Sequence, residues 1–186
     1  MRTRHITHTA LFAAIISIIS PIMIPVGPVP ITPATFIIML TPYVLTFSEA
    51  FTGLLIYLLL GLVGVPVFSG FRGGFQVFSS PTGGFLIGYI FLMVILFSFY
   101  RIGKKKTFTT LIGMFLGTLV MYEIGILWLQ FMTGLSHRAA FITVLPTIPG
   151  DIIKIVLATI VGPILRTRMF LAERGNTAER HVNENK

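Results

Sequence analysis

Two side chains of opposite charge stand close together near the C-terminal end of a chain that is otherwise almost free of charge. They are Asp151 and Lys154, within Pro149-Gly150-Asp151-Ile152-Ile153-Lys154. Residues three apart lie on the same face of a helix, and a charge at bilayer depth costs about 2.5–3.5 kcal/mol, so such groups usually face a cavity. A carboxylate accepts N–H donors, and an ammonium donates to a carbonyl or carboxylate. The pair is therefore our candidate site for a small polar ligand.

The same pair also allows a purely structural reading. Asp151 and Lys154 could form an ion pair with each other, and Asp151 could cap a helix that begins after Gly150. Residue types alone do not separate this reading from a binding site.

A second candidate site lies in a glycine-rich segment. The stretch Arg72-Gly73-Gly74-Phe75-Gln76 places a cation, flexible backbone amides, an aromatic ring and a side-chain amide within five residues, and Pro81-Thr82-Gly83-Gly84 ends the segment. Glycines let a backbone approach a ligand closely. The alternatives are an ordinary turn before a helix and a solvated Arg72.

Pairs of small residues at four-residue spacing occur in three apolar stretches. They are Ala10 with Ala14, Gly84 with Gly88, and Gly113 with Gly117. Such spacing lets a second helix come close, either within the chain or from another chain.

Two further groups of titratable residues stand in or beside apolar stretches. Glu123 lies inside one, which indicates a proton or cation site unless tyrosine or backbone groups partner it. His5 and His8 share a helix face but have no companion acid nearby in the sequence, so we expect no metal site there.

The composition is that of an integral membrane protein. The 186 residues are 54% hydrophobic and 11% charged, with a mean hydropathy of +0.90, whereas soluble domains are roughly 25% charged. The net charge of +8 comes from short basic groups beside apolar stretches and not from a basic face, which argues against a nucleic-acid partner. There is no cysteine, and the P-loop, H-E-x-x-H and G-x-S-x-G motifs are missing. We therefore expect neither an enzyme nor a cofactor.

Apolar stretches and helix breakers divide the chain into six spans. We expect these spans at residues 9–24, 34–46, 50–63, 84–100, 109–132 and 151–169. The second and third are shorter than the roughly 20 residues of an upright crossing, so they should be tilted or broken. Prolines predict an extended connection at 25–33, and the apolar loop at 64–83 is expected to pack inward as a lid.

The basic residues predict the orientation. Arg2 and Arg4, the cluster from Arg101 to Lys106, and Arg166 with Arg168 all fall on one side if six spans alternate, and the positive-inside rule makes that side cytoplasmic. We expect a cytoplasmic N-terminal tail at 1–8, a six-helix membrane domain at 9–170, and a polar, disordered cytoplasmic tail at 171–186. The loops at 25–33, 64–83 and 133–150 then form the outer, binding face.

Four segments, in this order and spacing, give the chain a resemblance to a known family. They are Gly27-Pro28-Val29-Pro30-Ile31-Thr32, the run from Leu58 to Phe68, Pro81-Thr82-Gly83-Gly84 with Leu86-Ile87-Gly88, and Leu145-Pro146 leading to Pro149-Gly150-Asp151 and Lys154. Over about residues 9–170 the chain resembles the BioY family, the biotin-specific substrate-binding (S) subunits of energy-coupling factor (ECF) transporters.

The resemblance implies an all-α, six-helix, multi-pass protein of a bacterial-type plasma membrane that binds biotin from outside. It also implies a complex with a transmembrane coupling subunit and two cytoplasmic ATPases, which would use the ATP, with Ala10 and Ala14 contacting the coupling subunit. On this basis we assign Asp151 to the ureido N–H groups of biotin and Lys154 to its carbonyl or carboxylate. The residues expected to close over or line the ligand are Thr82, Gly73, Gly74, Phe75 and Tyr89, with Gln76 beside them and Arg72 as a second partner for the carboxylate.

The chain departs from the family pattern in places that bear on the ligand. Phe85 stands where a tyrosine is common, and Pro33-Ala34 replaces a commoner Leu-Gln. Another vitamin or a biotin precursor is therefore an alternative ligand. Two rival functions belong to different classes of protein: a small lipid-modifying enzyme with Glu123 or Asp151 as base, and a subunit with a purely structural role.

Overall fold

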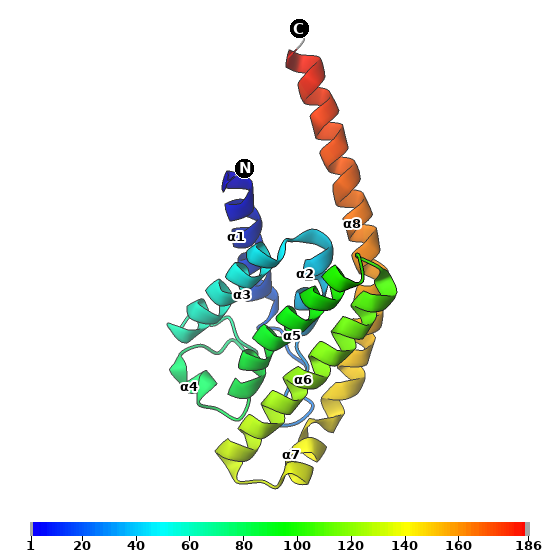
Figure 1. The fold of residues 1–186 in the computed structure, drawn as a ribbon. Coiled ribbons are helices and arrows are strands. Elements are labelled where there is room, and N and C mark those ends of the chain that lie inside the picture. The colour runs from blue at the N-terminus through cyan, green and yellow to red at the C-terminus, as the bar shows by residue number, and fades with distance from the viewer. Residues whose placement is uncertain (1, 185–186) are drawn as a thin grey trace.

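The computed structural model, which describes residues 2–184, is a bundle of α-helices (Figure 1). Its elements are α1 (Arg2–Ile19), α2 (Ala34–Val44), α3 (Phe47–Leu62), α4 (Phe75–Phe78), α5 (Gly83–Ile102), α6 (Thr107–Thr133), α7 (His137–Val144), a 3-10 turn (Leu145–Thr147) and α8 (Ile148–Glu184). The six expected spans correspond to α1, α2, α3, α5, α6 and α8, and α4 and α7 are short additions. Within the described residues there is no β-sheet, so the all-α prediction is confirmed.

Among residues 2–184, three helical stretches are long and apolar enough to cross a membrane, by length and composition. They are α5, α6 and the stretch His137–Met169, whereas α1, α2 and α3 are shorter apolar helices. Figure 1 shows both chain ends at one end of the bundle, and the loop before α4 and helix α7 at the opposite end. Because the basic residues lie at the end that carries the termini, the positive-inside rule predicts that this end is cytoplasmic.

Helix α1 differs from the expected first span at both ends. It begins at Arg2, so the described residues of the expected tail are helical, and it ends at Ile19 instead of Ile24. The early end has a clear cause, because Pro21 disfavours the helical conformation at Ser20. Ile24 instead pairs with Ile31 through two backbone hydrogen bonds of 2.9 and 3.0 Å, which close the proline-rich connection into a compact loop.

Local sequence signals affect the hydrogen bonding of α2 and set the start of α3. In α2, Pro42 cannot donate to the Ile38 carbonyl, which accepts the Thr41 hydroxyl instead at 2.7 Å. Helix α3 begins three residues earlier than expected because Thr46 and Glu49 form a reciprocal capping box. The spacing T-x-x-E is the known sequence signal for this cap.

Helices α5 and α6 pack closely along a row of glycines. A Cβ atom at Gly88 would lie 2.8 Å from Met121 Cγ, and one at Gly117 would lie 2.8 Å from a methyl carbon of Leu92. Small residues allow two backbones to approach in a membrane, where the hydrophobic effect does not drive helix association. The glycine spacings in α5 and α6 are therefore contacts within the chain.

The loop between α3 and α5 packs inward only in part. Val67, Phe68 and Val77 are buried, whereas Phe71 and Phe75 are each 70% exposed. The Phe68 ring, 1% exposed, meets Tyr57 edge to face with ring centroids 5.4 Å apart and lies against Gly61. Phe68 thus fastens this loop to α3.

We expect Gly61→Ala to lower the melting temperature of the protein. A Cβ atom at Gly61 would lie 2.0–2.5 Å from three atoms of the buried Phe68 ring, and overpacking of this kind costs about 1–3 kcal/mol. Melting followed by circular dichroism in detergent measures the effect. Adding Phe68→Leu should recover part of the loss if the clash is the cause; purely additive effects of the two substitutions would contradict it.

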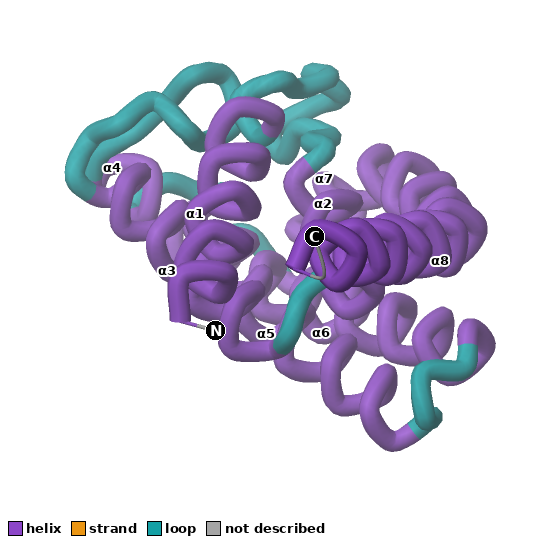
Figure 2. Tube along the Cα trace, turned by 90° about the horizontal axis from the view of Figure 1, so that it is seen from above, coloured by secondary structure: helices purple, strands orange, loops and turns teal. Residues whose placement is uncertain are grey.

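Helix α8 extends well beyond the bundle at its C-terminal end (Figure 1), and Figure 2 views this helix from its C-terminal end. The polar composition predicts disorder after residue 170, but the helix continues to Glu184. Residues 185–186 of the expected tail, like Met1 of the N-terminal one, lie outside the described residues. Residues 171–184 are thus helical in this structure, and the expected cytoplasmic location of this tail stays a prediction.

Candidate ligand-binding site

The carboxylate of Asp151 is the centre of a buried hydrogen-bond network. Asp151 lies in the first turn of α8 and is 6% exposed. Its Oδ1 accepts from the Thr35 hydroxyl at 3.1 Å and from Lys154 Nζ at 2.6 Å. Its Oδ2 accepts from the Tyr122 hydroxyl at 2.6 Å. Side chains from α2, α6 and α8 therefore converge on one negative charge.

Lys154 completes this network. Its Nζ also donates to the Thr35 hydroxyl at 3.1 Å, and its side chain is largely buried beside Asp151. The two charges thus form the ion pair that the structural reading expected. Asp151 does not cap the helix, however, because α8 begins at Ile148 and both carboxylate oxygens are bound to side chains. A carboxylate in the first turn still interacts favourably with the helix dipole.

The pair lines a small cavity. Its volume is about 40 Å³, and the residues around it are Val29, Pro30, Ile31, Thr32, Thr35, Phe85, Tyr89, Met121, Tyr122, Thr147, Asp151 and Lys154. Loop 25–33 forms one wall, and α5, α6 and α8 form the others. Sites for small molecules measure about 300–1,000 Å³. A ligand can therefore enter only if part of this wall moves.

Three of the predicted site residues come together in the structure. Asp151, Lys154 and Tyr89 all line the cavity. The combination brings a negative charge, a positive charge and a phenol together at one place, and their contact with a ligand stays a prediction.

The other predicted ligand contacts lie away from the cavity. Arg72 Nε donates to the Ser69 carbonyl at 3.1 Å, Gln76 Nε2 donates to the Gly73 carbonyl at 2.6 Å, and the Thr82 hydroxyl bonds with the Ser80 hydroxyl at 3.0 Å. Phe75 is exposed, and Gly74 forms the turn before α4. Their ligand roles remain predictions that require the loop between α3 and α5 to move.

Sequence reasoning missed nine of the twelve residues around the cavity, and four of them contribute polar or aromatic groups beside the charged pair. Thr35, Tyr122 and Thr147 supply hydroxyl groups, and Phe85 packs edge to face on Tyr122 with ring centroids 6.1 Å apart. A signal was available for Tyr122, because it precedes the intramembrane Glu123. Phe85, noted as a departure from the family pattern, lies within the site itself.

Two other titratable groups lie elsewhere. Glu123 is 55% exposed, with its Oε1 3.9 Å from His137 Nε2, and it does not line the cavity. His5 and His8 do have a companion acid, contrary to our expectation, since both Nδ1 atoms lie near Glu49 Oε1 at 2.8 and 3.2 Å. The acid comes from α3, more than 40 residues away along the chain.

Ala10 and Ala14 are both exposed on the outer face of α1. Leu11 and Ile18 beside them are exposed as well. A groove between α1 and α3 runs along this face, with Ala10, Thr52 and Ile56 in its lining. The α1 face is therefore open to another helix.

Known proteins resemble this chain over most of its length. A model of the BioY family matches residues 1–170. The biotin transporter BioY2 of Lactococcus lactis is 41% identical over 159 residues, covering 84% of this chain and 87% of that protein. The biotin transporter BioY of Rhizobium etli is 40% identical, covering 87% of this chain and 92% of that protein.

A solved structure agrees with these matches. The S-component for biotin from an ECF-type ABC transporter superposes with a TM-score of 0.82 at 30% identity, covering 89% of this chain and 92% of that one. The family model, the similar sequences and the solved structure agree, and the chain therefore belongs to the BioY family.

Proposed function

We propose that this chain is the biotin-binding S subunit of an ECF-type transporter, a transport subunit and not an enzyme. The observation that carries the proposal is the buried Asp151–Lys154 pair, which lines a small cavity together with residues of the proline-rich loop. The names of the relatives and of the similar structure support biotin as the ligand.

The chemistry of biotin fits the groups around the cavity. Its ureido ring carries two N–H donors and one carbonyl, its sulfur ring is apolar, and its tail ends in a carboxylate. Asp151 accepts from the ureido N–H groups and Lys154 donates to the carbonyl or carboxylate. A carboxylate has about four acceptor positions, and three protein donors occupy Asp151 in this structure. Binding therefore exchanges at least one protein hydrogen bond for a ligand bond.

The apolar sulfur ring of biotin is expected to pack against aromatic side chains of the cavity. Phe85, Tyr89 and Tyr122 line the cavity beside the charged pair. The ligand reaches them when loop 25–33 opens, because about 40 Å³ is far below the volume of a small-molecule site. Thr82 and the segment 72–76 then contribute contacts at the mouth, with Arg72 as a second partner for the carboxylate.

Inward delivery depends on other subunits. The sequence contains no P-loop, so ATP is hydrolysed by two cytoplasmic ATPase subunits, which act through a transmembrane coupling subunit in the plasma membrane. The exposed Ala10 and Ala14 allow a helix of the coupling subunit to pack closely on α1.

Titration of the purified chain with biotin tests the proposal. We expect one biotin per chain by calorimetry in detergent, and weaker binding of an analogue whose ureido oxygen is replaced by sulfur. Binding of another vitamin in preference to biotin would contradict the ligand while leaving the S subunit in place. Turnover of a lipid by the chain alone would contradict the transport function.

A further inference from the structure

A second and larger cavity opens at the cytoplasmic end of the bundle. Its volume is about 810 Å³, and it lies between the N-terminal parts of α1 and α3, the C-terminal ends of α2 and α5, and α8. None of the residues around the ligand-binding cavity lines it. It is therefore a separate feature that the proposed binding of biotin does not use.

Besides Arg4 of α1, basic side chains from three further elements surround this cavity. Arg101 comes from the last turn of α5, Lys105 from the turn between α5 and α6, and Arg166 from α8. Lys105 has a positive φ of 65°. Its backbone N–H donates to the Tyr100 carbonyl at 2.9 Å, which stabilises this conformation. Among the side chains that the structure describes, none of these three forms a salt bridge.

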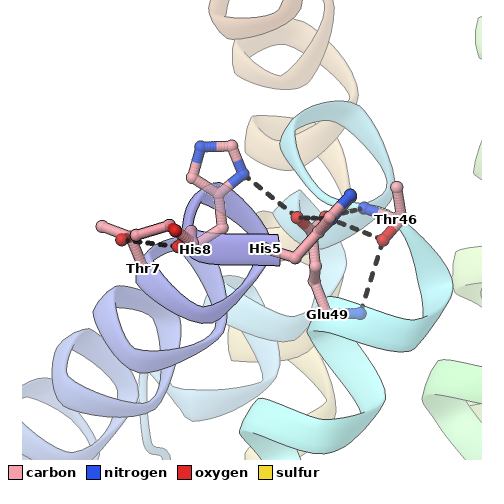
Figure 3. Close-up of polar contacts among 6 residues, drawn as sticks. His5, Thr7, His8, Thr46 and Glu49 are labelled. Atoms are coloured by element: carbon pink, nitrogen blue, oxygen red, sulfur yellow. Dashed lines mark hydrogen bonds and ion pairs between the residues drawn. The ribbon is translucent and has the colours of Figure 1, made fainter. Parts of the chain in front are cut away.

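The acid in the described lining, Glu49, is already occupied by its neighbours (Figure 3). Its Oε1 interacts with His5 and His8 at 2.8 and 3.2 Å, and its Oε2 accepts from the backbone N–H and the hydroxyl of Thr46, each at 2.7 Å. Glu49 is also buried. Its charge therefore serves the α1–α3 contact and does not neutralise the three basic groups.

Much of the remaining lining is apolar or aromatic. Phe47, Val94 and Phe97 contribute to the wall, and the exposed positions of α5 continue it as a stripe of Phe91, Val94 and Ser98 that ends at Arg101. These positions recur every three or four residues, so they lie along one face of the helix. A hydrocarbon chain can follow this face from the membrane interior to the basic groups.

We propose that this cavity binds an anionic phospholipid of the cytoplasmic leaflet. The phosphate lies among Arg101, Lys105 and Arg166, and an acyl chain lies along the exposed face of α5. Basic pockets between membrane helices on the cytoplasmic side attract anionic headgroups, and an arginine can bind a phosphate through two parallel hydrogen bonds. The combination of three clustered cations and an apolar stripe fits a lipid better than a soluble phosphate.

Native mass spectrometry of the full-length chain, purified in detergent and titrated with phosphatidylglycerol, tests this proposal. The wild-type chain should bind one phosphatidylglycerol at least about 10-fold more tightly than phosphatidylcholine. The double variant Lys105→Gln/Arg166→Gln should weaken phosphatidylglycerol binding about 25-fold, because each basic residue near an anionic lipid contributes about 5-fold. Lys105→Arg/Arg166→Lys keeps both charges and should retain the affinity.

The chain offers a matched control in Lys104→Gln/Arg168→Gln. This variant removes the same charge from neighbouring positions that do not line the cavity, and its affinity should stay within about 3-fold of wild type. Equal losses in the two neutralising variants, or equal binding of both lipids, would overturn the site. Inorganic phosphate that displaces phosphatidylglycerol at equal phosphate concentration would overturn the lipid as the ligand. Biotin titration of the same variants separates this result from the proposed function, because Lys105 and Arg166 lie outside the biotin cavity.

Discussion

Replacing Asp151 with asparagine is expected to weaken biotin binding by about 30-fold to several thousand-fold, the equivalent of about 2–5 kcal/mol. The substitution keeps the shape of the side chain but removes the charge that Thr35, Tyr122 and Lys154 all contact. It leaves the Lys154 ammonium in a buried place without its partner 2.6 Å away. Most of the loss in affinity therefore comes from the buried Lys154 ammonium that has lost its partner. Calorimetry with purified protein measures the affinity.

Two companion variants sharpen this experiment. Glu123→Gln removes a carboxylate from the membrane domain at an exposed position outside the cavity, and biotin affinity should not change. Tyr122→Phe removes one of the three donors to Asp151, and we expect a loss of about 10-fold to 100-fold, as for a single hydrogen bond to a charged group. Binding of wild-type strength by Asp151→Asn would rule out the ligand role of the pair.

Replacing Ala14 with tryptophan is expected to abolish biotin transport while leaving biotin binding by the isolated chain unchanged. Ala14 is exposed on α1, so the larger side chain fits the free subunit without disturbing its core. The same side chain prevents a partner helix from packing closely, which small residues permit. Uptake of labelled biotin by cells that also produce the coupling subunit and the ATPases measures transport, and calorimetry measures binding.

Leu119→Trp provides the control for this variant. Leu119 is exposed on α6, away from α1, and a tryptophan there should affect neither transport nor binding. Co-purification with the coupling subunit should fail for Ala14→Trp and succeed for Leu119→Trp. If Ala14→Trp also loses biotin binding, the alanines stabilise the subunit itself and are not a partner surface.

The main features of the fold could be predicted from the sequence because the membrane restricts what a chain can do. Apolar stretches must form helices that satisfy their own backbone hydrogen bonds, and basic residues remain on the cytoplasmic side. These two constraints placed the six spans and both termini. Where the predicted ends of α1 and α3 were wrong, the signals were local: Pro21 ends α1, and the capping box of Thr46 and Glu49 begins α3.

The candidate site was predictable only in part. The i, i+3 spacing of Asp151 and Lys154 places them on one helix face regardless of the rest of the chain, and burial of charge in a membrane indicates function. In contrast, Arg72, Phe75 and Gln76 had suitable chemistry, but the turn at Gly74 directs this segment away from the cavity. Local composition does not decide which way a loop faces.

By itself, the sequence determined the class of the protein, the positions of its membrane helices and the charged pair at the start of α8. Only the tertiary structure decided which side chains meet that pair. Thr35 lies 116 residues before Asp151, and Tyr122 lies 29 residues before it. Their contacts depend on how α2, α6 and α8 are rotated about their axes, and that rotation results from packing over the whole bundle. The same reason explains why Glu49 could be paired with His5 and His8 only once α1 lay against α3.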